Sequence, residues 1–388
     1  MYLDIVCTCF LFQTLCLSIL LRKQWIKHER FSFPLVQIPL EIATASPKGQ
    51  LFNTFFKNRF LWLGMSLPIL IHLINGLHAH FPNIPEIPRI YYIHRMFHGK
   101  PWHTLGWWSA VRIVIYFSVI GIAAMLTLEV SFSLWFFFLF FTLQYIIMNT
   151  IGLEINPWIS CSRQVMGGYL IFVPAIFWIG RGHFVDVIRK TFSRRNQWLL
   201  IDDTNEPLPY RKALFGVLIG FNTIVCWIAG ISVWVSLIVM LAIFITSIVL
   251  SWMVVNGGLL LVQAPFFPSE YITIVAGSSV IDSKSLAILG FQRGFFRDWG
   301  EFMMPNFLHN FRVLQGNKFS QKKILSILFL SITIAVIVSA YTSLGLIYGK
   351  GALNLQRWVY VNAPRNYFQQ MSNMIQFPLT HIGMRSIT

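Results

Sequence analysis

The feature of the sequence that most constrains its fold is a series of apolar segments, each about as long as a bilayer is thick. A membrane-spanning helix needs roughly 20 mostly apolar residues, and eight stretches reach or approach that length. They are residues 3–21, 60–77, 109–128, 132–151, 166–179, 213–229, 231–251 and 324–347. The sequence therefore predicts an all-α polytopic membrane protein.

A further apolar stretch, residues 254–291, is interrupted by glycine and proline. It contains Gly257, Gly258, Pro265 and Pro268. Helices broken in this way are tolerated at membrane depth where the exposed backbone is buried in protein or lines a wet cavity. We predict one or two half-helices or a re-entrant hairpin here. The expected total is eight to nine transmembrane helices plus this re-entrant or broken-helix element.

The composition supports this assignment and excludes two other classes of protein. Of the 388 residues, 56% are apolar and 11% are charged, whereas roughly 25% are charged in a soluble domain. So few charges could not cover the apolar surface of a water-soluble fold. An aromatic content of 16% excludes intrinsic disorder. We expect one transmembrane domain over residues 1–388.

The positions of the cationic residues indicate the topology. A net charge of +16 would indicate nucleic-acid binding in a soluble protein. Here, seven Lys and Arg residues fall in each of three segments, 22–59, 181–212 and 252–323, which even numbers of predicted crossings separate. Together these hold 21 of the 30 cationic residues, the pattern that the positive-inside rule predicts for cytoplasmic loops. We therefore predict a cytoplasmic location for all three, an N-terminus outside, and no nucleic-acid partner.

Within these loops, one segment favours an interfacial helix. Residues 181–212 begin with Phe184, Val185, Ile188 and Phe192 at helical spacing, with basic residues between them. This pattern is typical of an amphipathic helix that lies in the membrane interface. Residues 252–323 are expected to hold the broken helices and a cytoplasmic segment, and residues 348–388 form a predicted outer tail.

The loop after the second predicted span, residues 79–108, combines prolines with histidines. Pro82, Pro85 and Pro88 favour a stiff, extended cap on the outer face. Imidazole is the commonest metal ligand, and the candidate zinc or copper ligands are His78, His80, Glu86, His94 and His98. Their spacing matches no standard metal motif. A structural cap is the favoured interpretation, with a metal site as the alternative, and no cofactor is predicted.

Two discontinuities place polar groups at membrane depth, where such groups are costly and usually face a cavity or a partner. One lies near Pro68 in the second span, and the other is the Gly257–Gly258 pair. Unwound backbone at such breaks can offer carbonyls or amides to a substrate. The alternative for the glycines is a turn or close helix packing. The residues predicted to line a substrate path are His72, Asn75, Gly76, Asn256, Gly257, Gly258 and Gln263.

Several blocks of the sequence resemble large bacterial integral membrane proteins that are grouped with the oligopeptide-transporter-like (OPT-like) proteins. The blocks include residues 22–41 (RKQWIKHERFSFPLVQIPLE), 56–64, 251–263 and 303–309. The resemblance implies a protein of the bacterial inner membrane and names no activity. Relatives are longer at both ends, so we expect a shortened chain with a missing split half or other membrane subunits as partners. Relatives also often carry an acidic residue where Asn256 stands, which puts ion coupling in doubt.

The absence of catalytic motifs narrows the function. The sequence contains no P-loop, HExxH or GxSxG motif, and no Asp or Glu lies near the centre of a predicted span. We therefore predict no enzymatic activity. The leading hypothesis is a transporter-like permease that moves a small solute by alternating access. The alternative is a non-catalytic structural subunit of a larger membrane complex. A membrane-bound redox enzyme is a third hypothesis, which rests on the outer histidines alone.

Overall fold

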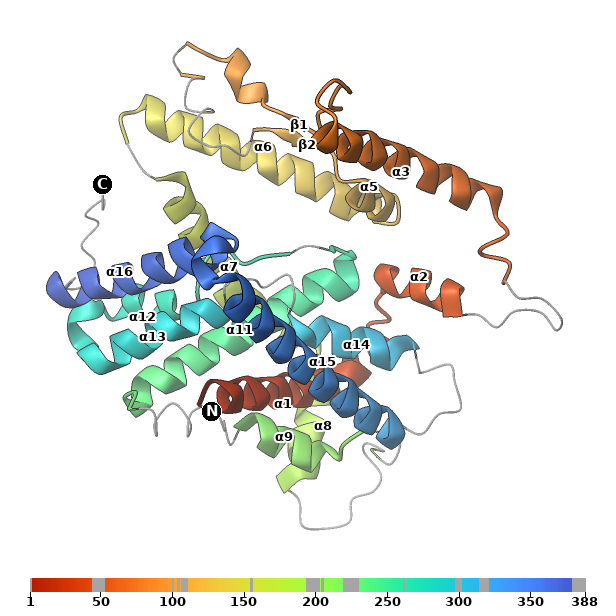
Figure 1. The fold of residues 1–388 in the computed structure, drawn as a ribbon. Helices are drawn as coiled ribbons and strands as arrows, with labels where there is room; N and C mark the ends of the chain where they lie inside the picture. The colour runs from red at the N-terminus through yellow and green to blue at the C-terminus, as the bar shows by residue number, and fades with distance from the viewer. Residues whose placement is uncertain are drawn as a thin grey trace. The chain divides into compact units, whose positions relative to one another are not determined.

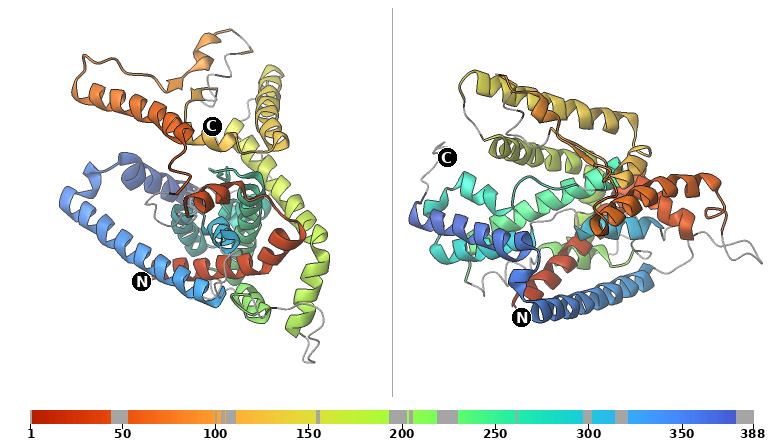
Figure 2. Two further views of the ribbon diagram at one scale, coloured as in Figure 1. Left: turned by 90° about the vertical axis from the view of Figure 1, so that its right-hand side faces the viewer. Right: turned by 45° about the horizontal axis from the view of Figure 1, so that its top comes forward.

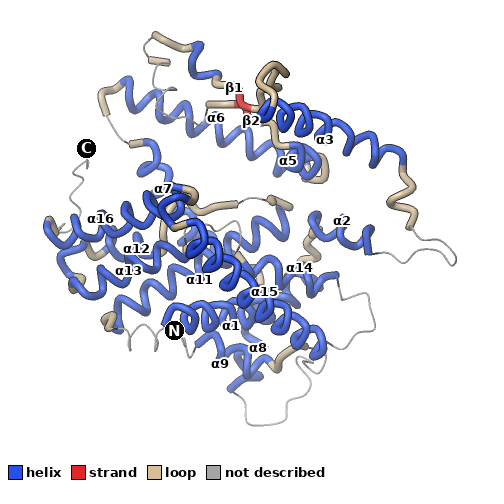
Figure 3. The backbone as a smooth tube through the Cα atoms, in the orientation of Figure 1, coloured by secondary structure: helices blue, strands red, loops and turns tan. Residues whose placement is uncertain are grey.

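Helices make up almost all of the regular structure in the computed structural model (Figures 1 and 3). The structure describes residues 2–43, 53–99, 101–102, 105, 111–153, 156–192, 203, 206–218, 230–260, 262–296, 302–313 and 321–378. Within these residues, five helices are long and apolar enough to cross a membrane: α3 (Arg59–His80), α6 (Leu128–Thr150), α7 (Pro157–Ile179), α11 (Val233–Gly257) and α15 (Gln321–Lys350). The predicted all-α fold is therefore confirmed for the described part of the chain.

The chain divides into two compact units. Unit 1 comprises Met1–Phe31, Ser162–Met253 and Leu261–Thr388, and unit 2 comprises Ser32–Cys161 and Val254–Leu260. The expectation of one transmembrane domain stays a prediction, and each unit is described by itself below.

Unit 1 contains most of the helices. Besides most of α7, most of α11 and all of α15, these are α1 (Tyr2–Lys23), the π-helical turn η1 (Gln24–His28), α8 (Arg181–Phe192), α9 (Tyr210–Leu218), α12 (Ser269–Val275), the 3₁₀ turn η3 (Ser278–Val280), α13 (Ser283–Phe295), α14 (Met303–Val313), the 3₁₀ turn η6 (Ala352–Asn354), the π-helical turn η7 (Trp358–Asn362) and α16 (Ala363–Gln376). Helices α13 and α16 lie side by side, as do α1 and α9, and α1 and α14 (Figures 1 and 2).

The buried core of unit 1 surrounds one face of α11. Ile231, just before the helix, and Val235, Val239 and Ile243 follow at four-residue spacing, so they lie along one helical face. The other buried members come from α12, α13, α16 and the segment before α13: Ile272, Ile281, Leu286, Leu289 and Met371. The two short helices that interrupt the last third of the chain are therefore part of the core.

The C-terminal ends of α1, α7 and α11 lie at one end of unit 1. Nε2 of His183, at the start of α8, lies 3.0 Å from the carbonyl oxygen of Leu20 in α1. The ring of Trp252, near the end of α11, lies 6.1 Å from that of Phe31 and 4.9 Å from that of Phe172 in α7. The cationic residues that the sequence places in or directly after the ends of α1 and α7 are Arg22, Lys23, Lys27, Arg30 and Arg181. We call this the basic end of unit 1.

An ion pair fixes a loop residue against the basic end. Nη1 of Arg22 lies 2.7 Å from Oε2 of Glu206, and each side chain is less than a tenth exposed. Asp203 accepts a hydrogen bond from Nζ of Lys190 at 2.6 Å. Because breaking a buried pair leaves an uncompensated charge, these contacts fix residues 203 and 206 to α1 and α8.

The predicted amphipathic helix is present as α8, but its buried face differs from the predicted apolar face. His183, Val187 and Thr191 are buried at four-residue spacing. Val185, Ile188 and Phe192 are exposed. The apolar side of α8 therefore points away from unit 1, as an interfacial helix requires.

Unit 2 is built on two long helices with little buried surface. It contains α2 (Pro34–Ala43), α3, the strand β1 (Ile90–Tyr91), the 3₁₀ turn η2 (Ile93–Met96), the strand β2 (Ile113–Val114), α5 (Phe117–Ala123) and α6. The strands pair antiparallel, with Ile90 opposite Val114 and Tyr91 opposite Ile113. No described side chain of α3 is buried.

Residues 109–128 do not form the predicted third span. Residues 113–114 belong to β2, and α5 covers Phe117–Ala123, while residues 109–110 lie outside the described part. The β-branched Ile113 and Val114 favour strand pairing, and the amide of Ile115 donates to the carbonyl of Arg89 at 2.9 Å. The prediction was wrong because an apolar run alone does not distinguish strand from helix.

The other predicted spans have helical counterparts in the described residues. α3, α6, α11 and α15 match the segments 60–77, 132–151, 231–251 and 324–347, and α7 begins earlier than predicted, at Pro157. The first segment is α1. Of the sixth, α9 ends at Leu218, and residues 219–229 lie outside the described part. The predicted total of eight to nine spans is not confirmed.

Candidate functional site

The broken-helix element begins where α11 ends at a glycine. Gly258 has φ +68°, and its amide donates to the carbonyl of Val254 at 3.0 Å, as in a helix C-cap. A Cβ at Gly258 would lie 2.8 Å from Cγ of Pro34. Only glycine fits this position without strain, which favours the interpretation of the glycine pair as a turn with close packing.

Two short helices follow the break, and each has a local reason to begin where it does. Pro268 precedes α12, as proline is tolerated at a helix start. Asp282 is the N-cap of α13, where its side chain accepts a hydrogen bond from the amide of Ser285. Asp282 also accepts a hydrogen bond from the hydroxyl of Ser232 at 2.6 Å, which ties the start of α13 to the start of α11.

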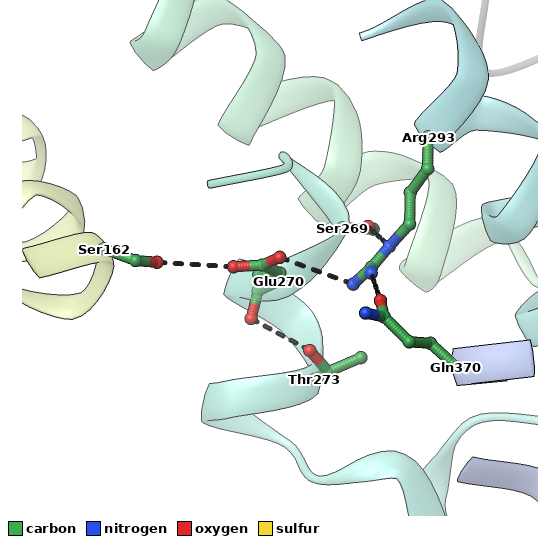
Figure 4. A network of polar contacts seen from close by, with 6 residues as sticks. All are labelled: Ser162, Ser269, Glu270, Thr273, Arg293 and Gln370. Carbon is green, nitrogen blue, oxygen red and sulfur yellow. Dashed lines mark hydrogen bonds and ion pairs between the residues drawn. The ribbon is translucent and has the colours of Figure 1, made fainter. Parts of the chain in front are cut away.

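An ion pair joins the two short helices (Figure 4). Nη2 of Arg293, in α13, lies 3.5 Å from Oε1 of Glu270, in α12. The Arg293 side chain is 3% exposed and the Glu270 side chain 25%. The hydroxyl of Ser162, in α7, donates to Oε2 of Glu270 at 3.4 Å. Charged side chains in such surroundings are costly, and they normally pair or line a functional pathway.

The guanidinium of Arg293 is surrounded by partners from three elements. Its Nε donates to the hydroxyl of Ser269 at 3.3 Å, and its Nη1 donates to the side-chain oxygen of Gln370 in α16. The ring of Phe267 lies 4.9 Å from its central carbon, which adds a cation–π contact. Arg293 is therefore held firmly in place.

Glu270 is held more loosely than Arg293. Both of its side-chain contacts, at 3.4 and 3.5 Å, are longer than a strong charge-assisted hydrogen bond. It is also the more exposed member of the pair. A carboxylate in this position can exchange its partner for a proton, a cation or a polar solute at less cost than the guanidinium can.

The position of α13 bears on the predicted topology, which stays a prediction. The start of α13 contacts Ser232, before α11, whereas the end of α11 lies at the basic end. A helix of 25 residues is about 37 Å long. Lys284, in the first turn of α13, therefore lies at the end of unit 1 opposite to Arg22. Arg293 also contacts Gln370 of the predicted outer tail, and α13 and α16 are neighbours.

The predicted path residues of α3 lie in unit 2, and one of them lines a cavity. The cavity has a volume of ≈480 Å³, and Pro68, His72, Arg89 and Tyr116 are among its lining residues. The His72 ring lies 6.4 Å from that of Phe117. His72 and Arg89 give this cavity a cationic or hydrogen-bond-donating side.

The neighbouring Asn75 has a structural role. Its amide donates to the carbonyl of Ile87 at 3.0 Å and accepts from the amide of Ile87 at 2.8 Å. Nδ1 of His78 lies 2.5 Å from the carbonyl oxygen of Ile84. Both side chains hold the proline-rich segment against α3. No side chain lies within 4 Å of a Cβ placed at Gly76.

The remaining predicted path residues fall in different units. Asn256, Gly257 and Gly258 belong to unit 2, and Gln263 belongs to unit 1. The carbonyl of Asn256 accepts a hydrogen bond from the hydroxyl of Ser32 at 3.2 Å. The carbonyl of Asn256 is therefore engaged by the protein itself.

Within the described residues, no three His, Cys, Asp or Glu side chains are grouped in a way that could hold a metal ion. His80, Glu86 and His98 are exposed, and the side chain of His94 lies outside the described part. The weak metal candidates therefore stay a prediction from sequence.

Sequence reasoning missed the Glu270–Arg293 pair. A usable signal existed, since Glu270 is the only acidic residue between Glu206 and Asp282, a stretch that is otherwise mostly apolar. Arg293 was counted among the loop cations that define the cytoplasmic side. A charge within an apolar stretch needs a partner, and that requirement would have directed attention to both residues.

The comparison with protein families covers almost the whole chain. Residues 4–387 match DUF6785, a family of unknown function. The chain belongs to the DUF6785 family. No curated protein and no solved structure matches it. For this DUF6785 protein, the geometry of its own residues must therefore carry the functional argument.

Proposed function

We propose that this DUF6785 protein is a permease-like protein that moves a small solute by alternating access, in the bacterial inner membrane that the OPT-like resemblance implies. The observation that carries the proposal is the Glu270–Arg293 pair on two short, interrupted helices. Transporters place binding and coupling groups on such discontinuous helices. Arg293 is the fixed charge of this site, and Glu270 is the group that exchanges partners.

The orientation in this proposal rests on the basic end. α1, α7 and α11 all end there, and these are three of the spans for which the sequence predicts an outside-to-inside direction. Positive residues that flank spans are retained in the cytoplasm. The basic end then faces the cytoplasm, and the starts of α11 and α13 lie toward the opposite side.

Uptake into proteoliposomes tests the permease proposal. The purified chain is reconstituted into liposomes, and radiolabelled short peptides and small carboxylic acids are added outside one at a time. At least one solute should enter faster than into empty liposomes, and Glu270→Gln should abolish that difference. Glu129→Gln, an exposed carboxylate in the first turn of α6, is the matched control and should keep uptake.

Equal uptake by wild type and Glu270→Gln would contradict the assignment of the Glu270–Arg293 pair as the transport site. An absence of uptake for every solute in the panel, with the protein folded in the liposomes, would favour the second function below.

The second function is a non-catalytic subunit of a membrane complex. The observation that favours it is that the most apolar windows of α3 and α15 contain no buried residue. Such helices offer much of their surface to lipid or to helices of other proteins. Purification in a mild detergent should then give the chain with partners at fixed stoichiometry, and a monodisperse single chain would contradict this function.

A further inference from the structure

A separate apolar cavity lies inside unit 1, between α15 and the pair α1 and α14. Its volume is ≈170 Å³, and it is lined by Leu11 and Leu15 of α1, Phe307 of α14 and one face of α15 between Leu328 and Ile337. None of these residues contributes to the Glu270–Arg293 site. The cavity is a groove along the inner face of an apolar helix of membrane-spanning length.

The chemistry of the lining selects a hydrocarbon occupant. Thr333 is the only polar residue among those that line the groove, and its hydroxyl already donates to the carbonyl of Phe329 at 2.8 Å. Among the described lining residues, the groove therefore offers no free side-chain group of the kind that a polar ligand would need. Apolar cavities of about this size stay dry and take up hydrocarbons.

The surroundings of α15 indicate which hydrocarbon can reach the groove. Its apolar segment, Leu325–Lys350, contains no buried residue, and Val336 and Ile337 on the groove side are more than half exposed. A helix of this kind borders the acyl chains of the bilayer. A lipid tail can therefore enter the groove from the side.

One end of the groove carries positive charge. Lys323 is exposed and lies five residues before Leu328, which is about 7.5 Å along a helix. Neither α14 nor α15 contains an Asp or Glu. Basic residues at the end of an apolar groove favour an anionic lipid headgroup.

We propose that this groove binds one anionic phospholipid, with an acyl chain between α15 and α1 and the phosphate at the Lys323 end of α15. The acyl chain fills the space that α15 leaves beside Leu15 and Phe307. This site does not depend on the proposed transport, because it is defined in the resting protein and is assayed without a solute.

Native mass spectrometry of the full chain tests the acyl-chain part of the site. The protein is reconstituted with equal amounts of phosphatidylglycerol and phosphatidylcholine and then extracted into detergent. Wild type should retain one phosphatidylglycerol. Val336→Trp and Thr333→Phe, which fill the groove, should each lower the retained fraction at least tenfold. Leu330→Trp, on the same helix at a residue outside the lining, should retain the lipid as wild type does.

The headgroup part is tested with a second pair of variants. Lys323→Gln should lower the preference for phosphatidylglycerol over phosphatidylcholine several-fold, whereas Lys350→Gln, at the other end of α15, should leave it unchanged. Equal retention of the two lipids by wild type would overturn the anionic assignment. Equal retention of phosphatidylglycerol by the groove-filling variants and by Leu330→Trp would overturn the assignment of the groove as the lipid site.

A cross-linking measurement covers the case in which a groove-filling variant does not fold. Wild-type protein with a phosphatidylglycerol that carries a diazirine in its acyl chain should be labelled within residues 9–17 and 325–338. Labelling of α15 with none in α1 would contradict the site, because a lipid bound only at the outer surface of α15 would give that result.

Discussion

Helix α11 of unit 1 and helix α6 of unit 2 are both long, apolar and free of charge at their centres, yet only α11 is packed into a core. In α11, 56% of the most apolar window is buried, against 11% in α6. The buried face of α11 includes small residues such as Ala242, Ser247 and Ser251. The centre of α6 carries bulky aromatic residues, including Trp135 and Phe137, which are exposed.

The difference shows that the length of an apolar helix does not determine whether the helix packs into a protein core. Inside a bilayer, lipid tails are as apolar as leucine, so helices associate through close packing and hydrogen bonds. Small residues let α11 approach its neighbours, and hydroxyl groups such as that of Ser247, which donates to the carbonyl of Ile243 at 2.6 Å, are satisfied within the helix. The aromatic surface of α6 is suited to lipid or to another protein.

The largest effect should come from removing the fixed charge of unit 1. Arg293→Met leaves Glu270 without its cation and removes the contacts to Ser269 and Gln370. We expect a loss of about 3 kcal/mol of stability or more, the usual result of breaking a buried pair on one side. The melting temperature in detergent measures this loss. Arg365→Met, an exposed arginine of α16, is the control and should melt close to wild type.

The next effect compares leucines of the two units. Leu289, in α13, is fully buried, whereas Leu63, in α3, is 68% exposed. Leu289→Ala creates a cavity and should cost about 2 kcal/mol or more. Leu63→Ala should change stability by less than about 0.5 kcal/mol. Chemical unfolding of both variants measures these costs, and equal costs would show that unit 2 is packed as tightly as unit 1.

A smaller effect is expected at the glycine that ends α11. Gly258→Ala places a Cβ at positive φ and against Pro34, which should cost about 1–3 kcal/mol in strain. Gly64→Ala, inside α3, meets no side chain within 4 Å and should stabilise by up to about 1 kcal/mol. Changes of opposite sign in the melting temperatures of the two variants would support a turn at Gly258. A neutral Gly258→Ala would instead favour an open, unwound backbone at this position.

The smallest effect is a dependence on pH at α8. The pKa of His183 is lowered, chiefly because the side chain is buried. The hydrogen bond to the Leu20 carbonyl and the charge of Asp186 raise the pKa, the charges of His28 and Lys23 lower it, and the net shift is downward. The unfolded chain therefore binds a proton more readily than the folded protein. Stability should fall as the pH drops below about 6.5 and should be insensitive to this group above that value.

Melting temperatures at pH 7.5 and 5.5 measure this dependence. His183→Gln should melt at more similar temperatures at the two pH values than wild type does, whereas an exposed control, His80→Gln, should keep the wild-type difference. An unchanged difference in His183→Gln would assign the effect to other groups.

The sequence located most long helices because their signal is local. Apolar run length placed α3, α6, α11 and α15 within a few residues, and the glycine pair marked the end of α11. The prediction of a span at residues 109–128 was wrong because Ile113 pairs with Tyr91, 22 residues earlier in the chain. A local sequence pattern does not contain such a contact. One short strand, β2, and the short helix α5 stand where the long helix was expected.

The contacts of the candidate site could not be predicted from the sequence for a similar reason, although the lone acidic residue Glu270 in an apolar stretch was a usable signal. Arg293 contacts Gln370 across 77 residues, and only the folded chain brings α12, α13 and α16 together. Counting charges assigned Arg293 to a loop, although burial makes it part of the core. Asn75 was predicted to line a substrate path, and in the structure its side chain hydrogen-bonds the backbone of Ile87.

A double-mutant cycle on the pair tests the central claim, that Glu270 and Arg293 interact inside unit 1, most directly. Stability is measured for wild type, Glu270→Gln, Arg293→Gln and the double variant in the same detergent. We predict a coupling energy of about 1 kcal/mol or more, so that the double variant loses clearly less than the sum of the single losses. Losses that add to within about 0.3 kcal/mol would contradict the pair, and with it the proposed site.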